Sequence, residues 1–210
     1  LLGIWAYNVW FGTTKIAFVN FQTITMGGIA KANDNSFIKL QEVPVEELDR
    51  LSGFDMVFVN GMGLRVVEEQ RQQIQKAADK GVLVYTTMAT NPANNICTID
   101  SVDQVALRGY LGSGGRRNYK NMLNYIRKNM DKKLISVEEP GAPIERSSDV
   151  LYHVDMDKPG DELDFISVEE YEKYLKSKQL YKEGAKKIVV TGQMADATGL
   201  IDTLERVGYN

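Results

Sequence analysis

The stretch "DMVFVNGMGLRVVEEQRQQIQKAADKGVLVYTT", residues 55–87, decides the fold class. It opens with an apolar run that ends in a glycine-rich turn, and it closes with a second run of β-branched and aromatic residues at 82–87. Between them, residues 65–81 carry apolar side chains at 67, 74, 77 and 78 and end at Gly81, which predicts an amphipathic helix with a glycine C-cap. Two buried strands joined by a helix lie parallel, so this stretch predicts a βαβ unit.

The same alternation continues on both sides of this unit. Further strands are predicted at 15–21 and 36–43, and a short helix at 44–51 that starts at Pro44 and ends near Gly53. Downstream, the pattern predicts a helix at 101–112 with Ser101 as N-cap, a helix at 116–130 and a short strand at 132–137. Because each strand is a nearly continuous apolar run, we expect an α/β fold, a flavodoxin-like doubly wound parallel sheet across residues 13–137.

The rest of the chain predicts the start of a second domain. Residues 138–185 are interpreted as a linker and a helix at 167–181, which is opened by the capping box formed by Ser167 and Glu170. Residues 186–210 then predict a strand, a loop and a helix. Because one β-α unit cannot bury both of its faces, we expect these residues to begin a second α/β domain.

The first twelve residues are strongly apolar. "LLGIWAYNVWF" carries no charge, and its Trp5, Tyr7 and Trp10 resemble the aromatic belt at a membrane surface. The segment is too short to span a bilayer alone, which needs about 20 apolar residues, so residues 1–12 are interpreted as the remnant of a membrane anchor. The alternatives are an apolar lead-in to a soluble protein and the apolar region of a signal peptide.

Composition excludes several classes of site. The single Cys97 excludes an internal disulfide and a cysteine-based metal cluster, and the single His153 excludes a multi-histidine metal site within this chain. A formal net charge of −3 gives no electrostatic case for binding nucleic acid.

Two loops and the single histidine supply candidate site residues. Arg65 follows the glycine-rich turn "NGMG", at a strand end where an arginine can meet a carboxylate ligand; the alternative is a tight turn with an exposed Arg. That turn lacks the pattern of a nucleotide-binding loop, so no bound nucleotide is expected in this region. Gln193 and Met194 lie in a second strand-to-helix loop, where Met194 is an adaptable contact for a flat macrocycle; the alternative is a plain connector. His153 is a candidate metal ligand or general base, against the alternative of a structural histidine.

Four segments in order resemble the large subunits of cobaltochelatase and magnesium chelatase. They are "GYLGSGGRRNYKNMLNYI" (109–126), "VLYHVDM" (150–156), "SVEEYEKYLKSKQLY" (167–181) and "KKIVVTGQMADATGLIDTLERVGYN" (186–210), the last ending in Glu-x-x-Gly-x-Asn. The resemblance implies a protein that holds a tetrapyrrole while a metal is inserted or removed, with most of its active-site cavity in the remainder of the large subunit. It also implies that His153 is an axial ligand or a proton donor.

Two departures from the family pattern matter. Val154 stands where many members have proline, and Gly192, Gln193 and Met194 replace an Arg-Ser-His sequence. The missing histidine puts ordinary metal insertion in doubt. A domain anchored at the bacterial inner membrane and facing the periplasm would have no ATP, so the haem-uptake branch of the family is favoured, with haem or another tetrapyrrole as substrate, iron or cobalt as the metal, and haem-uptake transport proteins as partners.

Two other functions stay open. The first is ATP-dependent cobalt insertion by a cytoplasmic cobaltochelatase, and the second is a module that binds haem without changing it. A flavodoxin-like redox protein is disfavoured, because the segment "NFQTITMGG" after the first strand lacks a phosphate-binding loop.

Overall fold

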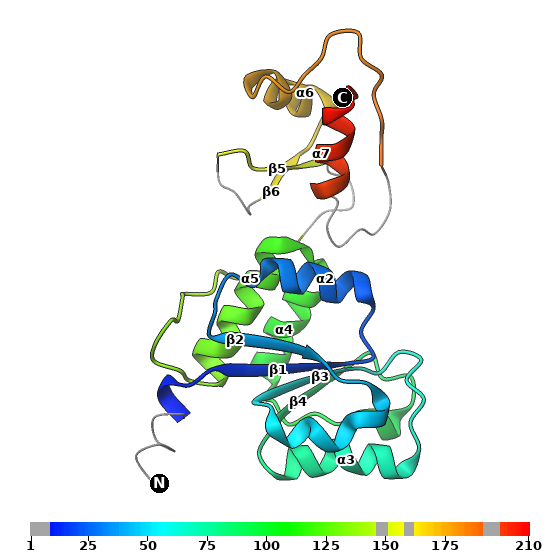
Figure 1. The fold of residues 1–210 in the computed structure, drawn as a ribbon, viewed down its shortest axis with the longest axis vertical. Coiled ribbons are helices and arrows are strands. Elements are labelled where there is room, and N and C mark those ends of the chain that lie inside the picture. The colour runs from blue at the N-terminus through cyan, green and yellow to red at the C-terminus, as the bar shows by residue number, and fades with distance from the viewer. Residues whose placement is uncertain (1–8, 146–150, 158–161, 191–197) are drawn as a thin grey trace.

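The computed structural model of the protein describes residues 9–145, 151–157, 162–190 and 198–210. Its centre is a parallel sheet of four strands in the order β2-β1-β3-β4 (Figure 1). The strands are β1 (Thr14–Val19), β2 (Ile38–Glu42), β3 (Met56–Asn60) and β4 (Leu83–Thr87). This order matches the first four positions of the flavodoxin-like order 2-1-3-4-5, and it confirms the predicted doubly wound α/β class.

Helices cover both faces of this sheet. On one side lie α2 (Thr23–Ala32), α4 (Ser101–Ser113) and α5 (Gly115–Tyr125), which continues as a π-helical stretch, η3 (Ile126–Met130). On the other side lie the 3₁₀ turns of η1 (Val45–Gly53) and the helix α3 (Glu68–Asp79). The predicted helices at 44–51, 65–81, 101–112 and 116–130 are therefore present, whereas α2 was not predicted. The N-cap of α4 is Asp100 instead of Ser101, since the Asp100 side chain accepts a hydrogen bond from the backbone of Asp103.

The two cores follow the alternation of side chains along the strands. Ile16, Phe18 and Phe58 point to the face that α2, α4 and α5 cover. Val19 and Val57 point to the opposite face and pack with residues of η1 and α3. All five side chains are fully buried. A continuous apolar run is required in each strand because both of its faces are covered.

The outer edge of β4 is closed by a segment that runs antiparallel to it. Cys97 forms an antiparallel bridge with Tyr85, and the Thr98 backbone N–H donates to the Val84 carbonyl at 2.9 Å. This pairing occupies the edge of β4, so a fifth parallel strand cannot add to the sheet there. The predicted strand at 132–137 is accordingly wrong, because these residues form bends and loop structure instead.

The proline- and glycine-containing segment 138–145 is attached to the first unit. Asn118 of α5 pairs with Ile144 in both directions, through its side-chain amide and carbonyl, at 2.9 Å each. One helical turn further, Asn121 accepts from the Gly141 backbone, and Tyr110 of α4 donates to the Gly141 carbonyl at 2.7 Å. The segment that composition marks as a linker thus follows a defined path over α4 and α5.

The predicted location at the inner membrane is wrong. None of the described helices combines the length and the apolar character that crossing a membrane requires. Residues 1–8 lie outside the described part of the chain, and Val9 and Trp10 pair with the folded unit: the Leu134 backbone donates to Trp10 at 2.8 Å, and the Lys133 ammonium donates to Val9 at 2.9 Å. These findings contradict the predicted placement at an inner membrane facing the periplasm.

Residues 151–210 form a small C-terminal unit. An antiparallel hairpin of β5 (Leu151–Val154) and β6 (Glu162–Phe165) packs with α6 (Val168–Ser177) and α7 (Thr198–Arg206) (Figure 1). Ser167 caps α6 as predicted, with its hydroxyl accepting from the Glu170 backbone at 3.2 Å. The hairpin was not predicted.

The predicted strand at the start of 186–210 is extended chain with one neighbour. Asn210 donates its backbone N–H to Lys186 and accepts one from Ile188, at 3.1 and 2.9 Å. This alternating pair of bonds is the pattern of two parallel strands, with α7 as the crossover between them. It supports the prediction that 186–210 belongs to a second α/β domain, which stays a prediction.

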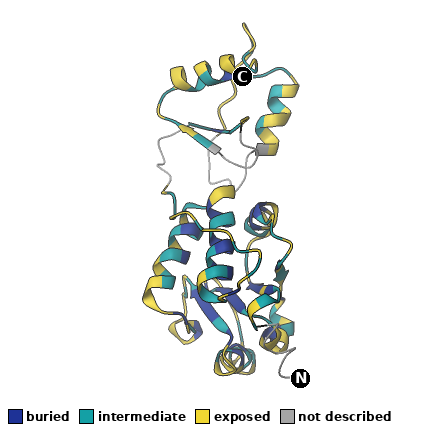
Figure 2. Cartoon of the chain, turned by 90° about the vertical axis from the view of Figure 1, so that its left-hand side faces the viewer, coloured by how far each residue is buried: buried dark blue, intermediate teal, exposed yellow. Residues whose placement is uncertain are grey.

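The two parts differ in how much they bury. Figure 2 shows buried residues concentrated in the sheet and the inner helix faces of the first unit. Among the described residues of 151–210, only His153 and Leu175 are buried, while Val189 is 75% exposed. The C-terminal unit therefore keeps apolar side chains at its surface around a cavity.

Candidate functional site

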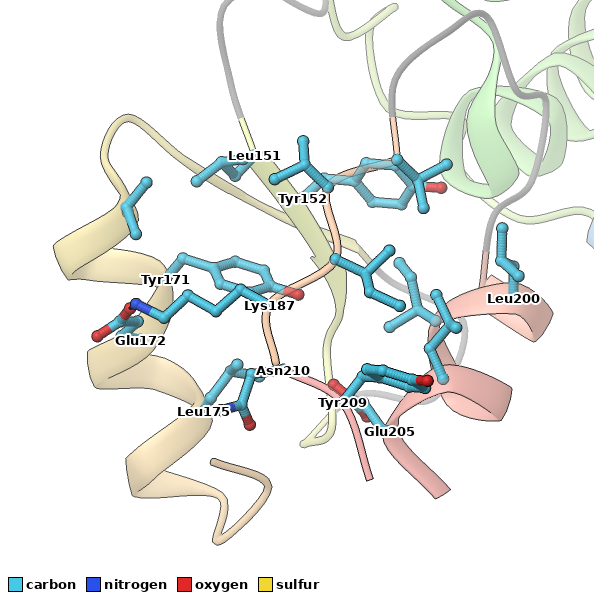
Figure 3. A pocket seen from close by; sticks show the side chains of 16 residues that line it. Leu151, Tyr152, Tyr171, Glu172, Leu175, Lys187, Leu200, Glu205, Tyr209 and Asn210 are labelled. Atoms are coloured by element: carbon cyan, nitrogen blue, oxygen red, sulfur yellow. Dashed lines mark hydrogen bonds and ion pairs between the residues drawn. The ribbon is translucent and has the colours of Figure 1, made fainter. Parts of the chain in front are cut away.

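A cavity of about 220 Å³ lies within the C-terminal unit (Figure 3). Its walls come from β5, α6, the extended segment 187–190, α7 and the last two residues of the sequence, Tyr209 and Asn210. Most of the lining is aliphatic, including Leu151, Leu175, Ile188, Leu200, Ile201 and Leu204. The polar exceptions include Tyr171, Glu205 and Tyr209. An apolar cavity with a few polar groups on its wall is the usual form of a small-molecule site.

Glu205 is held in this wall by the single histidine of the chain. The Nε2 atom of His153 lies 2.8 Å from the Oε1 atom of Glu205. The His153 side chain is 1% exposed and that of Glu205 is 16% exposed, so the imidazole lies behind the carboxylate. His153 itself does not line the cavity. The tertiary structure thereby pairs two segments of the chain that lie 52 positions apart.

Both nitrogens of His153 are engaged. The Nδ1 atom lies 2.8 Å from the Val154 carbonyl, which only accepts, so Nδ1 carries a proton. The Nε2 atom then either donates to a Glu205 carboxylate or accepts from a protonated Glu205. The pair shares one proton in both cases, and neither nitrogen is left to ligate a metal. The predicted role as axial ligand would require this pairing to break.

Aromatic rings surround the imidazole. The rings of Tyr171 and Tyr174, both on α6, lie 5.9 and 5.4 Å from it between centroids. The Tyr174 hydroxyl donates to the same Val154 carbonyl at 3.0 Å. Burial, with the nearby Glu205 charge, raises the pKa of Tyr171 to about 12, so its hydroxyl stays neutral. The pair is therefore packed on one side by rings and faces the cavity on the other.

The charge state of His153 follows from these contacts. Burial lowers the pKa of an imidazole, but the hydrogen bonds to Glu205 and to the Val154 carbonyl raise it by more, and the net pKa is raised. Glu205 lies in the last turn of α7, where the helix dipole disfavours a negative charge. A protonated His153 offsets that cost.

The stability of the C-terminal unit is expected to fall as the pH rises above about 6.5. A folded-state pKa above the ordinary value of 6.5 means that the charged imidazole stabilises the fold fully below that value, and that this contribution is lost as the pH rises through the folded-state pKa. Thermal unfolding from roughly pH 5.5 to 9, with His153→Gln as the control that flattens the curve, measures the effect. Because the chain has one histidine, its NMR titration reports the pKa directly, and a value below 6.5 would contradict the prediction.

Of the other predicted residues, the structure describes only Arg65. Arg65 is exposed in the loop between β3 and α3, with no hydrogen bond or ion pair to another described residue, and it does not line the cavity. Gln193 and Met194 lie outside the described part of the chain. No cluster of three His, Cys, Asp or Glu side chains within the described ranges is placed to hold a metal ion.

The carboxyl edge of the four-stranded sheet, where α/β folds often bind ligands, is closed by its own loops. Asn20 donates to the Asn60 carbonyl at 2.8 Å and to the Met62 carbonyl at 3.2 Å. A Cβ atom on Gly61 would lie 2.6 Å from the Ala89 Cα atom, so the loops after β3 and β4 are in direct backbone contact. The glycine-rich turn at residues 60–63, which precedes Arg65, therefore packs closely against the loop after β4.

Glu205 was not among the predicted site residues. Its signal was present in the sequence, since Glu205 and Asn210 end the last segment that resembles the chelatases, and His153 lies in an earlier one. What the sequence did not supply is that α7 turns Glu205 toward β5.

Comparison with known families bears on the same part of the chain. Residues 108–210 match the family model described as CobN/Magnesium Chelatase. This match includes α5, both strands of the hairpin, α6 and α7, and therefore His153 and Glu205. It supports the predicted resemblance to the chelatases at the level of the family, and it does not single out the haem-uptake branch.

The fold is similar to the catalytic subunit of cobaltochelatase from Mycobacterium tuberculosis, with 13% sequence identity and a TM-score of 0.46 over 66% of this chain. The aligned part spans 12% of that subunit. Curated proteins gave no sequence match.

Proposed function

We propose that this chain is part of the large subunit of a chelatase-type enzyme, which holds a tetrapyrrole while a metal ion enters or leaves it. The observation that carries the proposal is the match of residues 108–210 to the CobN/Magnesium Chelatase family model. The metal ion and the tetrapyrrole are the substrates, and the remainder of the large subunit is the first partner.

The chemistry of the C-terminal unit supports this proposal. Metal exchange in a tetrapyrrole moves protons on and off the pyrrole nitrogens, which calls for a positioned acid or base. Glu205 and His153 share one proton at the wall of an apolar cavity. The cavity of about 220 Å³ is smaller than the roughly 300–1,000 Å³ of pockets for drug-sized ligands. We therefore assign the enclosure of the macrocycle to other parts of the large subunit.

Within this family we favour removal of iron from haem. The motivation is the sequence at 192–194, where Gly192, Gln193 and Met194 replace the Arg-Ser-His that the resemblance leads one to expect. Without that histidine, the chain lacks a ligand that would hold an incoming metal. Two protons on the pyrrole nitrogens replace the metal without ATP, so the reverse reaction requires proton donors and ligands that receive the released iron.

The full-length protein tests this proposal. Incubated with iron protoporphyrin under reducing conditions, it should shift the absorption spectrum of the haem on binding and then release the metal-free porphyrin, which is detected by its fluorescence. Incubated instead with a metal-free corrin, cobalt(II), ATP and an ATPase partner, it should insert no cobalt. Cobalt insertion would replace the favoured direction by the cobaltochelatase reaction, and return of unchanged haem would indicate a binding module. No spectral change with any tetrapyrrole would contradict the proposal as a whole.

A further inference from the structure

We propose that the cavity of the C-terminal unit is a binding site for a single apolar ring that bears an N–H group, with the Glu205 carboxylate as the acceptor. This inference rests on the cavity alone and goes beyond the metal-exchange function proposed above. The expected ligand is small and apolar, and it carries one hydrogen-bond donor.

The volume sets the size of the ligand. An apolar cavity of about 150 Å³ holds one benzene molecule. The cavity here, of about 220 Å³, therefore has room for one substituted or fused ring. Aliphatic side chains from β5, α6 and α7 form most of its wall, which favours an apolar body.

The polar groups on the wall set the chemistry. The Lys187 ammonium is paired with Glu172, and the Asn210 side-chain amide bonds the Lys182 backbone in both directions. These groups are already satisfied. Among the described residues, the second oxygen of Glu205, Oε2, has no hydrogen-bond partner. A group that enters the cavity on the side of His153 therefore meets a vacant carboxylate acceptor, the Oε2 atom of Glu205.

The pairing with His153 keeps that acceptor in place. Since Nδ1 donates to Val154, the shared proton lies between Nε2 and the Oε1 atom of Glu205. Whichever of these two atoms holds the proton, Oε2 remains an acceptor. The rings of Tyr171 and Tyr174 fix the imidazole, so the carboxylate is oriented before a ligand arrives.

Indole and 1-methylindole are matched probes, because they have the same fused ring and differ in the N–H. Titration of the protein by NMR should show indole binding about tenfold or more tightly than 1-methylindole, the factor that a hydrogen bond to a charged group supplies. The ring signals of Tyr171 and Tyr209 should shift with both probes, because both residues line the cavity. Equal affinity for the two probes, or no binding of either, would overturn the proposal.

Two variants locate the acceptor. Glu205→Leu removes the acceptor together with the partner of His153. It should abolish the preference for indole and leave the affinity for 1-methylindole within about twofold, because leucine keeps a side chain of similar size at the cavity wall. Glu172→Gln is the control, since its carboxylate lines the same cavity but is already paired with Lys187; the preference should persist. A preference that survives Glu205→Leu would place the acceptor elsewhere and refute the assignment. If Glu205→Leu does not fold, the comparison of the two probes in the unaltered protein still decides.

Discussion

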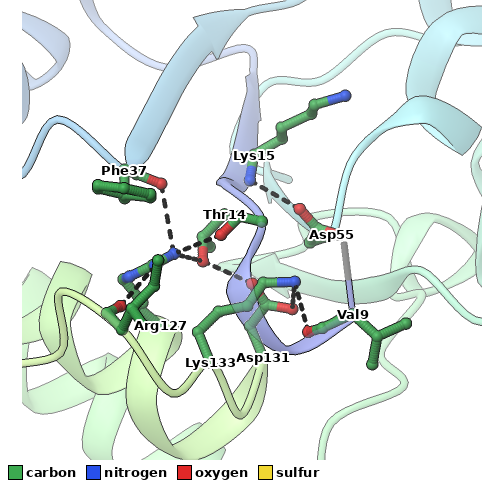
Figure 4. A network of polar contacts seen from close by, with 10 residues as sticks. Val9, Thr14, Lys15, Phe37, Asp55, Arg127, Asp131 and Lys133 are labelled. Carbon is green, nitrogen blue, oxygen red and sulfur yellow. Dashed lines mark hydrogen bonds and ion pairs between the residues drawn. The ribbon is translucent and has the colours of Figure 1, made fainter. Parts of the chain in front are cut away.

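Replacing Arg127 with alanine is expected to lower the free energy of unfolding by about 3–5 kcal/mol, the range for removing one member of a buried charged network. The Arg127 side chain is fully buried at the amino-terminal edge of the sheet (Figure 4). Its guanidinium makes five hydrogen bonds, to the Thr14 hydroxyl at 2.9 Å and to four backbone carbonyls, those of Gly12, Phe37, Ile135 and Ser136. Alanine would remove this donor from the buried Thr14 hydroxyl and from the partly buried carbonyls of Gly12 and Ile135. The carbonyls of Phe37 and Ser136 would keep a second donor each, from Thr14 and Asn35.

The network around Arg127 explains why the loss is large. Thr14 also donates to the Asp131 carboxylate at 2.5 Å, and the Phe37 ring lies 5.2 Å from the guanidinium carbon. Burial lowers the pKa of Arg127, and the Asp131 charge opposes that shift. One side chain thereby joins the start of β1, the start of β2 and the loop after η3.

Chemical denaturation followed by circular dichroism measures this effect. Arg117→Ala is the matched control, because Arg117 is exposed on α5, and a change there should stay within about 0.5 kcal/mol. Arg127→Lys should fall between the two, since a lysine keeps the charge but lacks the planar fork of donors. Equal stability of the Arg127 and Arg117 variants would show that the network contributes little.

The second large effect is expected for Phe58→Ala, at about 3–5 kcal/mol, the usual range for a buried phenylalanine. Phe58 lies in the middle of β3 and is fully buried. Its ring stacks on Phe18 with centroids 5.2 Å apart and planes at 6°, and it meets Tyr85 edge-on at 6.1 Å. Alanine removes the ring that links three neighbouring strands and leaves a cavity between the sheet and its helices.

The same denaturation experiment tests this expectation. Met62→Ala is the control, because Met62 lies shortly after the same strand and is 49% exposed, so its loss should stay within about 0.5 kcal/mol. Phe58→Leu should cost less than Phe58→Ala, because leucine fills part of the space. A Phe58→Ala protein as stable as the Met62 variant would mean that the core collapses to fill the cavity.

Local patterns determined the first unit of this protein. Strands with unbroken apolar runs can only lie in a sheet covered on both faces, and the helix at 68–79 between β3 and β4 requires those strands to be parallel. Period and composition are properties of neighbouring residues, so the α/β class and most element positions could be predicted. The cap of α4 was misplaced by one residue because Asp100 and Ser101 are both good caps, and only the backbone geometry distinguishes them.

Tertiary structure alone decided the pairings between distant residues. Residues 132–137 have the composition of a strand, but the edge of β4 is already taken by the segment around Cys97. Arginine is usually found at the protein surface, yet Arg127 is buried because five hydrogen-bond acceptors from other segments surround its guanidinium. Neither the occupation of a strand edge nor the position of distant acceptors can be recognised in a short stretch of sequence, because both depend on residues far away along the chain.

The candidate site also combines features that could be predicted from the sequence with features that only the tertiary structure decided. The sequence by itself marked His153 as the one imidazole and predicted the helix that became α7. Only the packing of α7 against β5 brought Glu205 to within 2.8 Å of the His153 ring and left the carboxylate at the cavity wall. In the structure both nitrogens of this buried ring are bonded, and it is Glu205, not His153, that lines the cavity, so the role predicted for His153 stays a prediction.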